Sequence, residues 1–283
     1  MMKHNKKMKF YLIRIITLYI PLALFLIWAL FPLYWMIVTS IKSNSELMRL
    51  THPLTVKAPT LDQYKDLILK SDFRYWIKNS LVVALTTTIF SVIISSLAAY
   101  SLARIKFVGR WVVSRSVLFS YLIPRTILFL PLFAVIQNMR LTDTIIGLML
   151  ANLTFMVPFC TWILIGHFTS VPKEIEECAT IDGCSRLKTL MLITIPIAAP
   201  GIVVAAVFTF SLSWSEFLYP LVLNTSSLRQ VVPVGLSNLI TGDLFEWGQI
   251  MATGFIFTLP IIILFYPIQR YLASGLTAGA VKG

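Results

Sequence analysis

Long uninterrupted apolar runs constrain this chain more than any other feature of its sequence. Six such runs cover residues 15–38, 77–102, 111–136, 144–165, 198–222 and 250–271. A helix needs about 20 apolar residues to cross roughly 30 Å of hydrocarbon, where only helices and closed barrels satisfy every backbone hydrogen bond. The sequence therefore predicts an all-α integral membrane protein with six transmembrane helices, of which the third and fourth are exposed to kinking by Pro124, Pro131 and Pro158.

The composition supports one membrane domain and argues against nucleic acid as a partner. The 283 residues are 57% hydrophobic and 13% charged, whereas soluble domains are about a quarter charged. The net charge of +12 comes from lysines and arginines that flank the spans, where they set topology and meet anionic membrane lipid. The aromatic residues lie inside the spans, so no basic surface with stacking platforms is expected.

The distribution of basic residues predicts that both termini are cytoplasmic. More lysines and arginines fall on the segments that are then inside than on the outer loops, as the positive-inside rule requires. The first apolar run exceeds the ~7–15 residues of a secretory signal and no small-residue cleavage site follows, so we expect it to be retained. The expected organisation is a cytoplasmic segment 1–14, a permease domain 15–272 and a cytoplasmic tail 273–283. In the first outer loop, Thr60 and the residues after it predict a short interfacial helix.

The polar residues do not form a recognisable catalytic or metal site. Cys160, Cys178 and Cys184 include no CxxC pair, and the three histidines lie far apart in the sequence. No acid–base or nucleophile–base pair emerges, and the GxxxxGK[ST] loop that cradles nucleotide phosphates is missing. We therefore expect no enzyme activity, no metal and no cofactor on this chain, which should neither bind nor hydrolyse ATP alone.

A polar segment interrupts the apolar sequence between the fourth and fifth spans, at SVPKEIEECATIDGCSRLKTLMLITIP (170–196). Pro172 suits a first helical turn, and the acidic residues after it lie near the positive end of that helix dipole. Gly183 is free to adopt the left-handed conformation that ends helices, Ser185 can cap a second helix, and Pro196 should close it. Each helix is about ten residues, roughly 15 Å, which is too short to cross a bilayer. The segment predicts a cytoplasmic helical hairpin whose small residues Cys178 and Ala179 allow a partner to approach closely.

This segment resembles the EAA signature of the membrane subunits of ABC importers. Glu177, Ala179, Asp182, Gly183 and Pro196 match the signature, and Cys178 replaces its usual alanine with another small residue. The stretches FRYWIKNSLVVA (73–84), AAYSLARIKF (98–107), LSWSEFLYPL (212–221) and the C-terminal LTAGAVKG are similar to the carbohydrate, MalG-like branch of that family, with Ser215 in place of the usual asparagine.

The resemblance implies a coupling helix between spans 4 and 5, seated in a cleft of a separate ATPase. The residues that would couple to it are Glu174, Glu177, Cys178, Ala179, Asp182 and Gly183. It also implies a second, MalF-like permease subunit as a heterodimeric partner, two cytoplasmic ABC ATPase subunits that bind ATP and Mg, an extracytoplasmic solute-binding protein, and a prokaryotic plasma membrane. The solute would be a sugar or oligosaccharide.

Two charged residues stand out because they lie away from the ends of the predicted spans, where charge is costly and usually functional. Arg125 and Glu216 would lie at similar depths, so we expect them to face the translocation path or to pair across it; the alternative for Arg125 is that it snorkels to the outer surface. Ser213, Trp214 and Ser215 lie beside Glu216 and offer an aromatic face and hydroxyls of the kind that sugars bind. Aromatic residues near a span end also serve as interface anchors.

Two other classes of function compete with the importer. A secondary transporter or channel would work without an ATPase, but it would be expected to show internal repeats and several buried ionisable groups. A membrane enzyme is the weakest alternative, because no catalytic set is apparent. Copurification of stoichiometric ATPase subunits separates the importer from the transporter.

Overall fold

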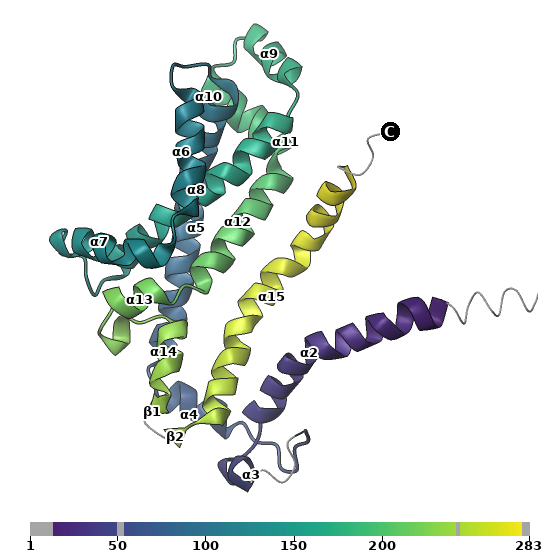
Figure 1. The fold of residues 1–283 in the computed structure, drawn as a ribbon, viewed down its shortest axis with the longest axis vertical. Coiled ribbons are helices and arrows are strands. Elements are labelled where there is room, and N and C mark those ends of the chain that lie inside the picture. Colours follow the sequence, from purple (N-terminus) through teal and green to yellow (C-terminus); the bar gives the residue numbers. More distant parts are fainter. Residues whose placement is uncertain (1–13, 50–53, 242–243, 279–283) are drawn as a thin grey trace, which may run out of the picture. The chain divides into compact units, whose positions relative to one another are not determined.

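The computed structural model describes residues 14–49, 54–241 and 244–278, which are almost entirely helical (Figure 1). The chain divides into two compact units, residues 1–71 with 239–256 and residues 72–238 with 257–283. In chain order the elements are η1 (Ile15–Tyr19), α2 (Ile20–Ser40), α3 (Asn44–Arg49), α4 (Asp62–Lys70), α5 (Phe73–Arg104), α6 (Arg110–Leu122), α7 (Arg125–Asn138), α8 (Ile145–Ser170), α9 (Lys173–Ile181), α10 (Arg186–Thr189), η2 (Leu190–Thr194), α11 (Ile195–Ile197), α12 (Ala199–Trp214), α13 (Leu218–Leu223), η3 (Ser227–Arg229), α14 (Val232–Asn238), β1 (Ile240–Thr241), β2 (Leu244–Phe245) and α15 (Trp247–Ala278).

The first unit contains the N-terminal span and two short helices. The π turn η1 continues into α2, so that Ile15–Ser40 forms one apolar run of 26 residues. The short helix predicted in the first outer loop is confirmed as α4, and the Thr60 hydroxyl accepts a hydrogen bond from the Asp62 amide at 3.1 Å. Strands β1 and β2 form a small antiparallel pair before α15 begins. The predicted N-terminal segment 1–14 lies outside the described residues except for Arg14, and α15 continues to Ala278 through the first part of the predicted tail.

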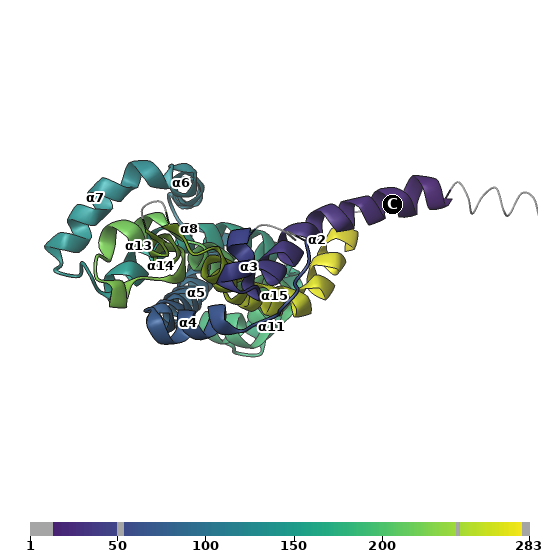
Figure 2. The same cartoon turned by 90° about the horizontal axis from the view of Figure 1, so that it is seen from below.

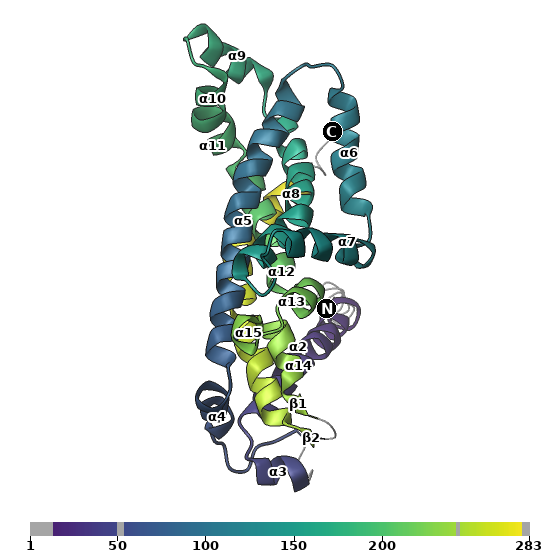
Figure 3. The same ribbon diagram turned by 90° about the vertical axis from the view of Figure 1, so that its left-hand side faces the viewer.

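The second unit is built around α5, which packs against α8 and α12 (Figures 1 and 3). Small and hydroxyl side chains let these helices approach closely. Ala99 on α5, Cys160 on α8 and Ala205 on α12 are all fully buried in one cluster. Ser95 on α5 donates a hydrogen bond to the Val157 carbonyl of α8 at 2.9 Å, which fixes the register of the two helices.

The predicted third span, 111–136, is not one continuous helix, because it breaks at Pro124, one of the prolines at which the sequence predicted a kink. Helix α6 ends at Leu122, and α7 starts at Arg125 in a direction bent by 100° from α6 (Figure 2). Pro124 is the cause, because proline disfavours the helical conformation in the residue before it. Ile123 is accordingly extended, with ψ of 124°.

The predicted fifth span, 198–222, is also wrong as a single helix. Helix α12 ends at Trp214, and α13 begins only at Leu218. Pro196 lies one residue before the end of the continuous helical run Arg186–Ile197, which agrees with its predicted place at the end of that helix. The helical run Arg186–Ile197 meets α12 at a bend of 81°. The described residues hold four helices long and apolar enough to cross a membrane, and six spans when each bent pair counts as one.

Candidate functional site

Helix α9 lies beyond the ends of α5 and α8 (Figures 1 and 3). Residues next to it in the sequence determine where it begins and ends. Pro172 precedes its first residue. At the other end Gly183 has φ of +83°, the Cys184 amide donates to the Ala179 carbonyl at 2.9 Å, and the Gly183 amide donates to the Thr180 carbonyl at 3.1 Å. This is the Schellman arrangement that ends helices at a left-handed glycine. Two local predictions are confirmed: Gly183 ends the helix, and Ser185 caps the next one by accepting from the Lys188 amide.

One face of α9 is exposed and carries most of the predicted coupling residues. Glu174, Glu177, Cys178 and Ile181 are exposed and spaced i, i+3, i+4 and i+7, so they form one stripe along the helix. We call these four residues the outer stripe. Asp182 and Gly183 continue the exposed surface at its C-terminal end, and Glu174 lies in the first turn, where a negative charge is favourable.

Ala179 differs from the sequence prediction because it does not face outward. It is only 5% exposed and lies on the inner face of α9 with Glu176. Its small side chain therefore allows α9 to approach its own chain, whereas Cys178 alone presents a small side chain on the outer stripe.

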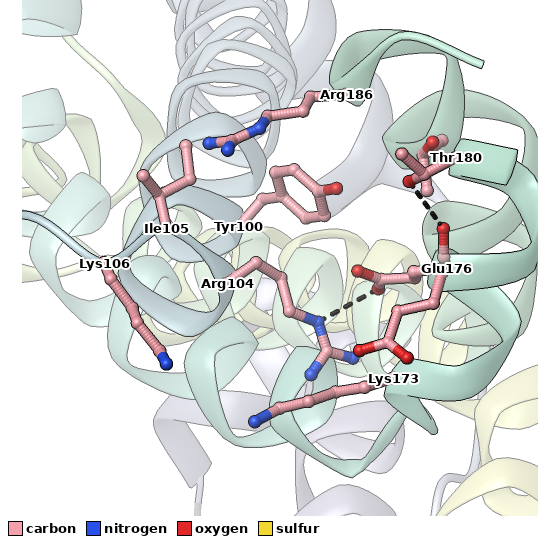
Figure 4. Close-up of a pocket in the computed structure, with 10 residues that line it drawn as sticks. Tyr100, Arg104, Ile105, Lys106, Lys173, Glu176, Thr180 and Arg186 are labelled. Carbon is pink, nitrogen blue, oxygen red and sulfur yellow. Dashed lines mark hydrogen bonds and ion pairs between the residues drawn. The ribbon is translucent and has the colours of Figure 1, made fainter. Parts of the chain in front are cut away.

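The inner face of α9 is held by a buried ion pair. Glu176 Oε1 lies 3.0 Å from Nε of Arg104, the last residue of α5, and both side chains are at most 10% exposed (Figure 4). The same oxygen accepts from Thr194 Oγ1 at 2.9 Å, and Arg104 Nη2 donates to the Val171 carbonyl, which ends α8. Charged groups this buried require such partners, because an unpaired charge out of water costs several kcal/mol.

A pocket of about 340 Å³ adjoins this ion pair between α5, α9 and α10 (Figure 4). Lys106, Lys173 and Arg186 line it together with Tyr100, Arg104, Ile105, Glu176, Glu177, Thr180 and Thr189. Four of the ten lining residues are cationic and two are anionic. The space between α9 and the end of α5 is therefore polar, and the Arg104–Glu176 pair forms part of its wall with both side chains at most 10% exposed.

The structure brings the two charged residues of the predicted path together. Arg125 Nη1 and Glu216 Oε2 lie 2.9 Å apart, and the Tyr219 hydroxyl donates to the Arg125 carbonyl at 2.9 Å. Both residues lie at helix breaks, because Arg125 opens α7 after the 100° bend and Glu216 lies between α12 and α13. The other carboxylate oxygen of Glu216 accepts from the Leu218 amide at 3.1 Å. The pair thus joins two interrupted helices.

Of the three neighbours of Glu216 that the sequence offered for a sugar, Trp214 and Ser213 are buried and Ser215 is exposed. Trp214 is 2% exposed, stacks on both Phe210 and Phe257, and donates from Nε1 to the Phe257 carbonyl. Ser213 accepts a hydrogen bond from Asn152 Nδ2 at 3.1 Å and is buried. Ser215 is exposed, but its hydroxyl donates to the Ser211 carbonyl. Trp214 and Ser213 therefore anchor α12 to its neighbours.

Sequence reasoning missed the partners of α9. Glu176 was placed with the other acidic residues of the segment, and neither Arg104 nor Thr194 was connected with it. One signal was available: Glu176, Ala179 and Thr180 have the i, i+3, i+4 spacing of one helix face, opposite the outer stripe. An acidic residue on an inner face needs a cation, and Arg104 follows the predicted span 77–102 on the side of the membrane where the sequence also placed α9.

Comparison with known proteins decides the family. Residues 91–278 match the model of the binding-protein-dependent transport system inner membrane component, which is well over half of the chain. The chain belongs to this family of ABC transporter permeases. The permease is 36% identical over 272 residues to the trehalose/maltose transport system permease protein MalG of Thermococcus litoralis, covering 95% of this chain and 97% of that one. It is 34% identical over 270 residues to the inner membrane ABC transporter permease protein YcjP of Escherichia coli K12, covering 95% and 96%.

A solved structure shares the fold of the permease. A chain of a bacterial ABC transporter involved in the import of the acidic polysaccharide alginate superposes with a TM-score of 0.80 at 19% identity, covering 90% of the permease and 95% of that chain. Family and fold confirm an all-helical, multi-pass membrane protein that serves a binding-protein-dependent ABC importer. The permease subunit is not itself catalytic, and the secondary transporter considered from the sequence gives way to this family.

Proposed function

We propose that the permease forms half of the translocation path of an ATP-driven sugar or oligosaccharide importer, and that its loop 177–183 is bound by a separate cytoplasmic ATPase subunit. The observation that carries this proposal is the outer stripe of α9. A nine-residue helix with an acidic, largely polar exposed face, standing beyond the membrane-length helices, offers a docking surface that no packing within the described chain uses.

The assembly follows from that surface and from the family. A second, MalF-like permease subunit completes the path, two ATPase subunits bind ATP and Mg, and an extracytoplasmic solute-binding protein delivers the solute. Closure of the ATPases on ATP would move their clefts, and α9 would carry this motion to the membrane helices. The proposal includes cytoplasmic N- and C-termini, because the outer stripe must face the ATPases.

The sugar assignment is supported by the relatives and by the charge pair. One relative is a trehalose/maltose permease, and the chain of similar fold serves an importer of a polysaccharide. At the two helix breaks, Arg125 retains 29% exposure of its side chain, so its guanidinium has donors in reach of a passing hydroxyl. We assign Arg125 and Glu216 to the wall of the path.

The test separates docking from folding. Glu177→Lys reverses a charge of the outer stripe, and Gly183→Val places a β-branched side chain at a positive φ. Both variants should reach the membrane, yet lose copurifying ATPase subunits and uptake of ¹⁴C-labelled maltose or trehalose. Asp62→Lys is the matched control, since it reverses an exposed charge of α4 and should retain the ATPase subunits. Normal docking and uptake by both α9 variants would refute the proposal.

A further inference from the structure

We propose that Arg104 and Glu176 form a joint that passes the motion of α9 directly to α5, and that they are positioning residues for coupling. The inference rests on the proposed function, because it concerns the path taken by force after the ATPase has bound the outer stripe. The Arg104–Glu176 joint comprises these two side chains and their hydrogen bonds to Thr194 and Val171.

The chain itself links α9 to the membrane helices only through bends. Before α9, Val171 is extended and Pro172 precedes the first turn; after it, Gly183 is left-handed. A bend absorbs rotation of one helix against another, because its backbone torsions are free of the helical hydrogen-bond ladder. Covalent connection alone therefore transmits the movement of α9 to α8 and α10 imperfectly, and to α5 only indirectly.

The Arg104–Glu176 joint supplies a direct connection. A single carboxylate oxygen of α9 accepts from Arg104 of α5 and from Thr194 of η2, while a second nitrogen of the same guanidinium binds the carbonyl of Val171. Arg104 is the last residue of the 32-residue helix α5, and its side chain is only 7% exposed. α5, α9, η2 and the residue after α8 thus meet at two side chains, whose mutual contact is drawn in Figure 4.

Apolar packing does not replace this connection. Within the described residues, α9 packs mainly on α10 and η2, and the space between α9 and the end of α5 is the polar pocket. By contrast, α5 packs closely on α8 and α12 along its length. A displacement of α9 that moves α5 therefore also moves the helices at the centre of this unit. The Arg104–Glu176 ion pair is the contact through which we infer that α5 is moved.

The prediction is that α9 and α5 move as one body when the ATPases close. Spin labels placed at Ile175→Cys on α9 and Leu97→Cys on α5, both more than 40% exposed, report their separation. The exposed Cys178 and the partly exposed Cys184 are first replaced by serine. In the assembled complex the distance should be the same without nucleotide and after trapping with ATP and orthovanadate.

Glu176→Gln tests the joint with the least disturbance, because the amide keeps an acceptor oxygen and the shape of the side chain while removing the charge. In this variant the trapped complex should show a shifted or broadened distance, with ATPase subunits still bound. The charge swap Arg104→Glu with Glu176→Arg should restore part of the fixed distance. Asp66→Asn neutralises an equally short but exposed ion pair with Lys70 and should leave the distance unchanged.

A second measurement follows the consequence for transport. In proteoliposomes supplied with maltose or trehalose, whichever the unmodified complex accumulates, Glu176→Gln should lower the sugar imported per ATP hydrolysed by roughly 2- to 30-fold, the range of a coupling change of this kind. Loss of mere stability would lower hydrolysis and uptake together and leave their ratio unchanged.

The outcomes distinguish this inference from the proposed function. A distance that changes in the unmodified complex, or one that stays fixed in Glu176→Gln, overturns the joint while leaving ATPase docking intact. Failure of the unmodified chain to bind any ATPase subunit overturns the proposed function instead. A fixed distance in the unmodified complex, lost in Glu176→Gln with the ATPases still bound, supports both the joint and the docking of an ATPase on this chain.

Discussion

Two ion pairs tie distant parts of this permease together, and they differ in how far water reaches them. In the Arg104–Glu176 pair both side chains are at most 10% exposed, whereas in the Arg125–Glu216 pair the arginine keeps 29% exposure. The first pair lies beside α9 and closes a contact among four elements, while the second lies at two broken helices within the membrane segments. The difference indicates that the buried Arg104–Glu176 pair fixes the position of α9 against α5. The partly exposed Arg125–Glu216 pair remains able to contact a solute in the proposed path.

The largest effect on stability is expected when the Arg104–Glu176 pair loses its arginine. Arg104→Met leaves the Glu176 carboxylate buried without its cation, which should cost about 3–5 kcal/mol of stability. The measurement is the midpoint of thermal unfolding of the detergent-purified complex, together with its amount in the membrane. A variant as stable as the unmodified protein would show that the carboxylate finds water or another cation.

A smaller effect on stability is expected when the Arg125–Glu216 pair loses its carboxylate. Glu216→Gln removes the charge facing Arg125 but leaves an oxygen for the Leu218 amide, so the loss should be about 2 kcal/mol, typical of a charge-assisted hydrogen bond. Uptake of labelled maltose or trehalose should fall more than the thermal midpoint does. Equal loss of stability at both pairs would remove the distinction between them.

Access to water gives a graded test of the same comparison. Arg125→Cys should be modified by a charged thiol reagent at least in part, and modification should slow when sugar is supplied. Arg104→Cys replaces a side chain that is 7% exposed and should be modified more slowly than Arg125→Cys, which replaces one that is 29% exposed. If neither Arg125→Cys nor Glu216→Cys is modified in any transport state, the assignment of this pair to the path fails.

The smallest effect is expected at an exposed pair that resembles the others only in its distance. Lys70 Nζ and Asp66 Oδ1 of α4 are 2.9 Å apart with most of the lysine in water. Asp66→Asn should change stability by only about 0.3–0.5 kcal/mol, as for other i,i+4 pairs on helix surfaces. A loss comparable with that of Arg104→Met would mean that burial is not what separates these pairs.

Hydropathy and local chemistry predicted much of this molecule. The runs around 15–38, 77–102, 144–165 and 250–271 correspond to continuous helices, because a span depends only on apolar length. The turn at Gly183 and the cap at Ser185 were equally local, since each is decided within a few residues. Such features do not require knowledge of what the helix packs against.

The breaks and the long-range pairs were harder to predict for a physical reason. Pro124 bends the chain by 100° while Pro158 lies within continuous α8, and the residue type alone does not distinguish these two outcomes. Arg104 and Glu176 are 72 residues apart, and Arg125 and Glu216 are 91 apart. Of these, only the second pair was anticipated, because two isolated charges in apolar runs have few available partners, whereas Glu176 had several lysines and arginines nearby in sequence.

The gap between Trp214 and Leu218 has a consequence for lipid. Peptide groups that leave a helix cannot remain bare among acyl chains, where nothing donates or accepts in their place. Here the Glu216 carboxylate takes up the Leu218 amide, and the Glu216 amide finds only a stretched contact of 3.4 Å with the Ser213 carbonyl. Backbone held by such weak contacts has to be shielded from the acyl chains by protein or reached by water from within, so we expect no lipid against this break.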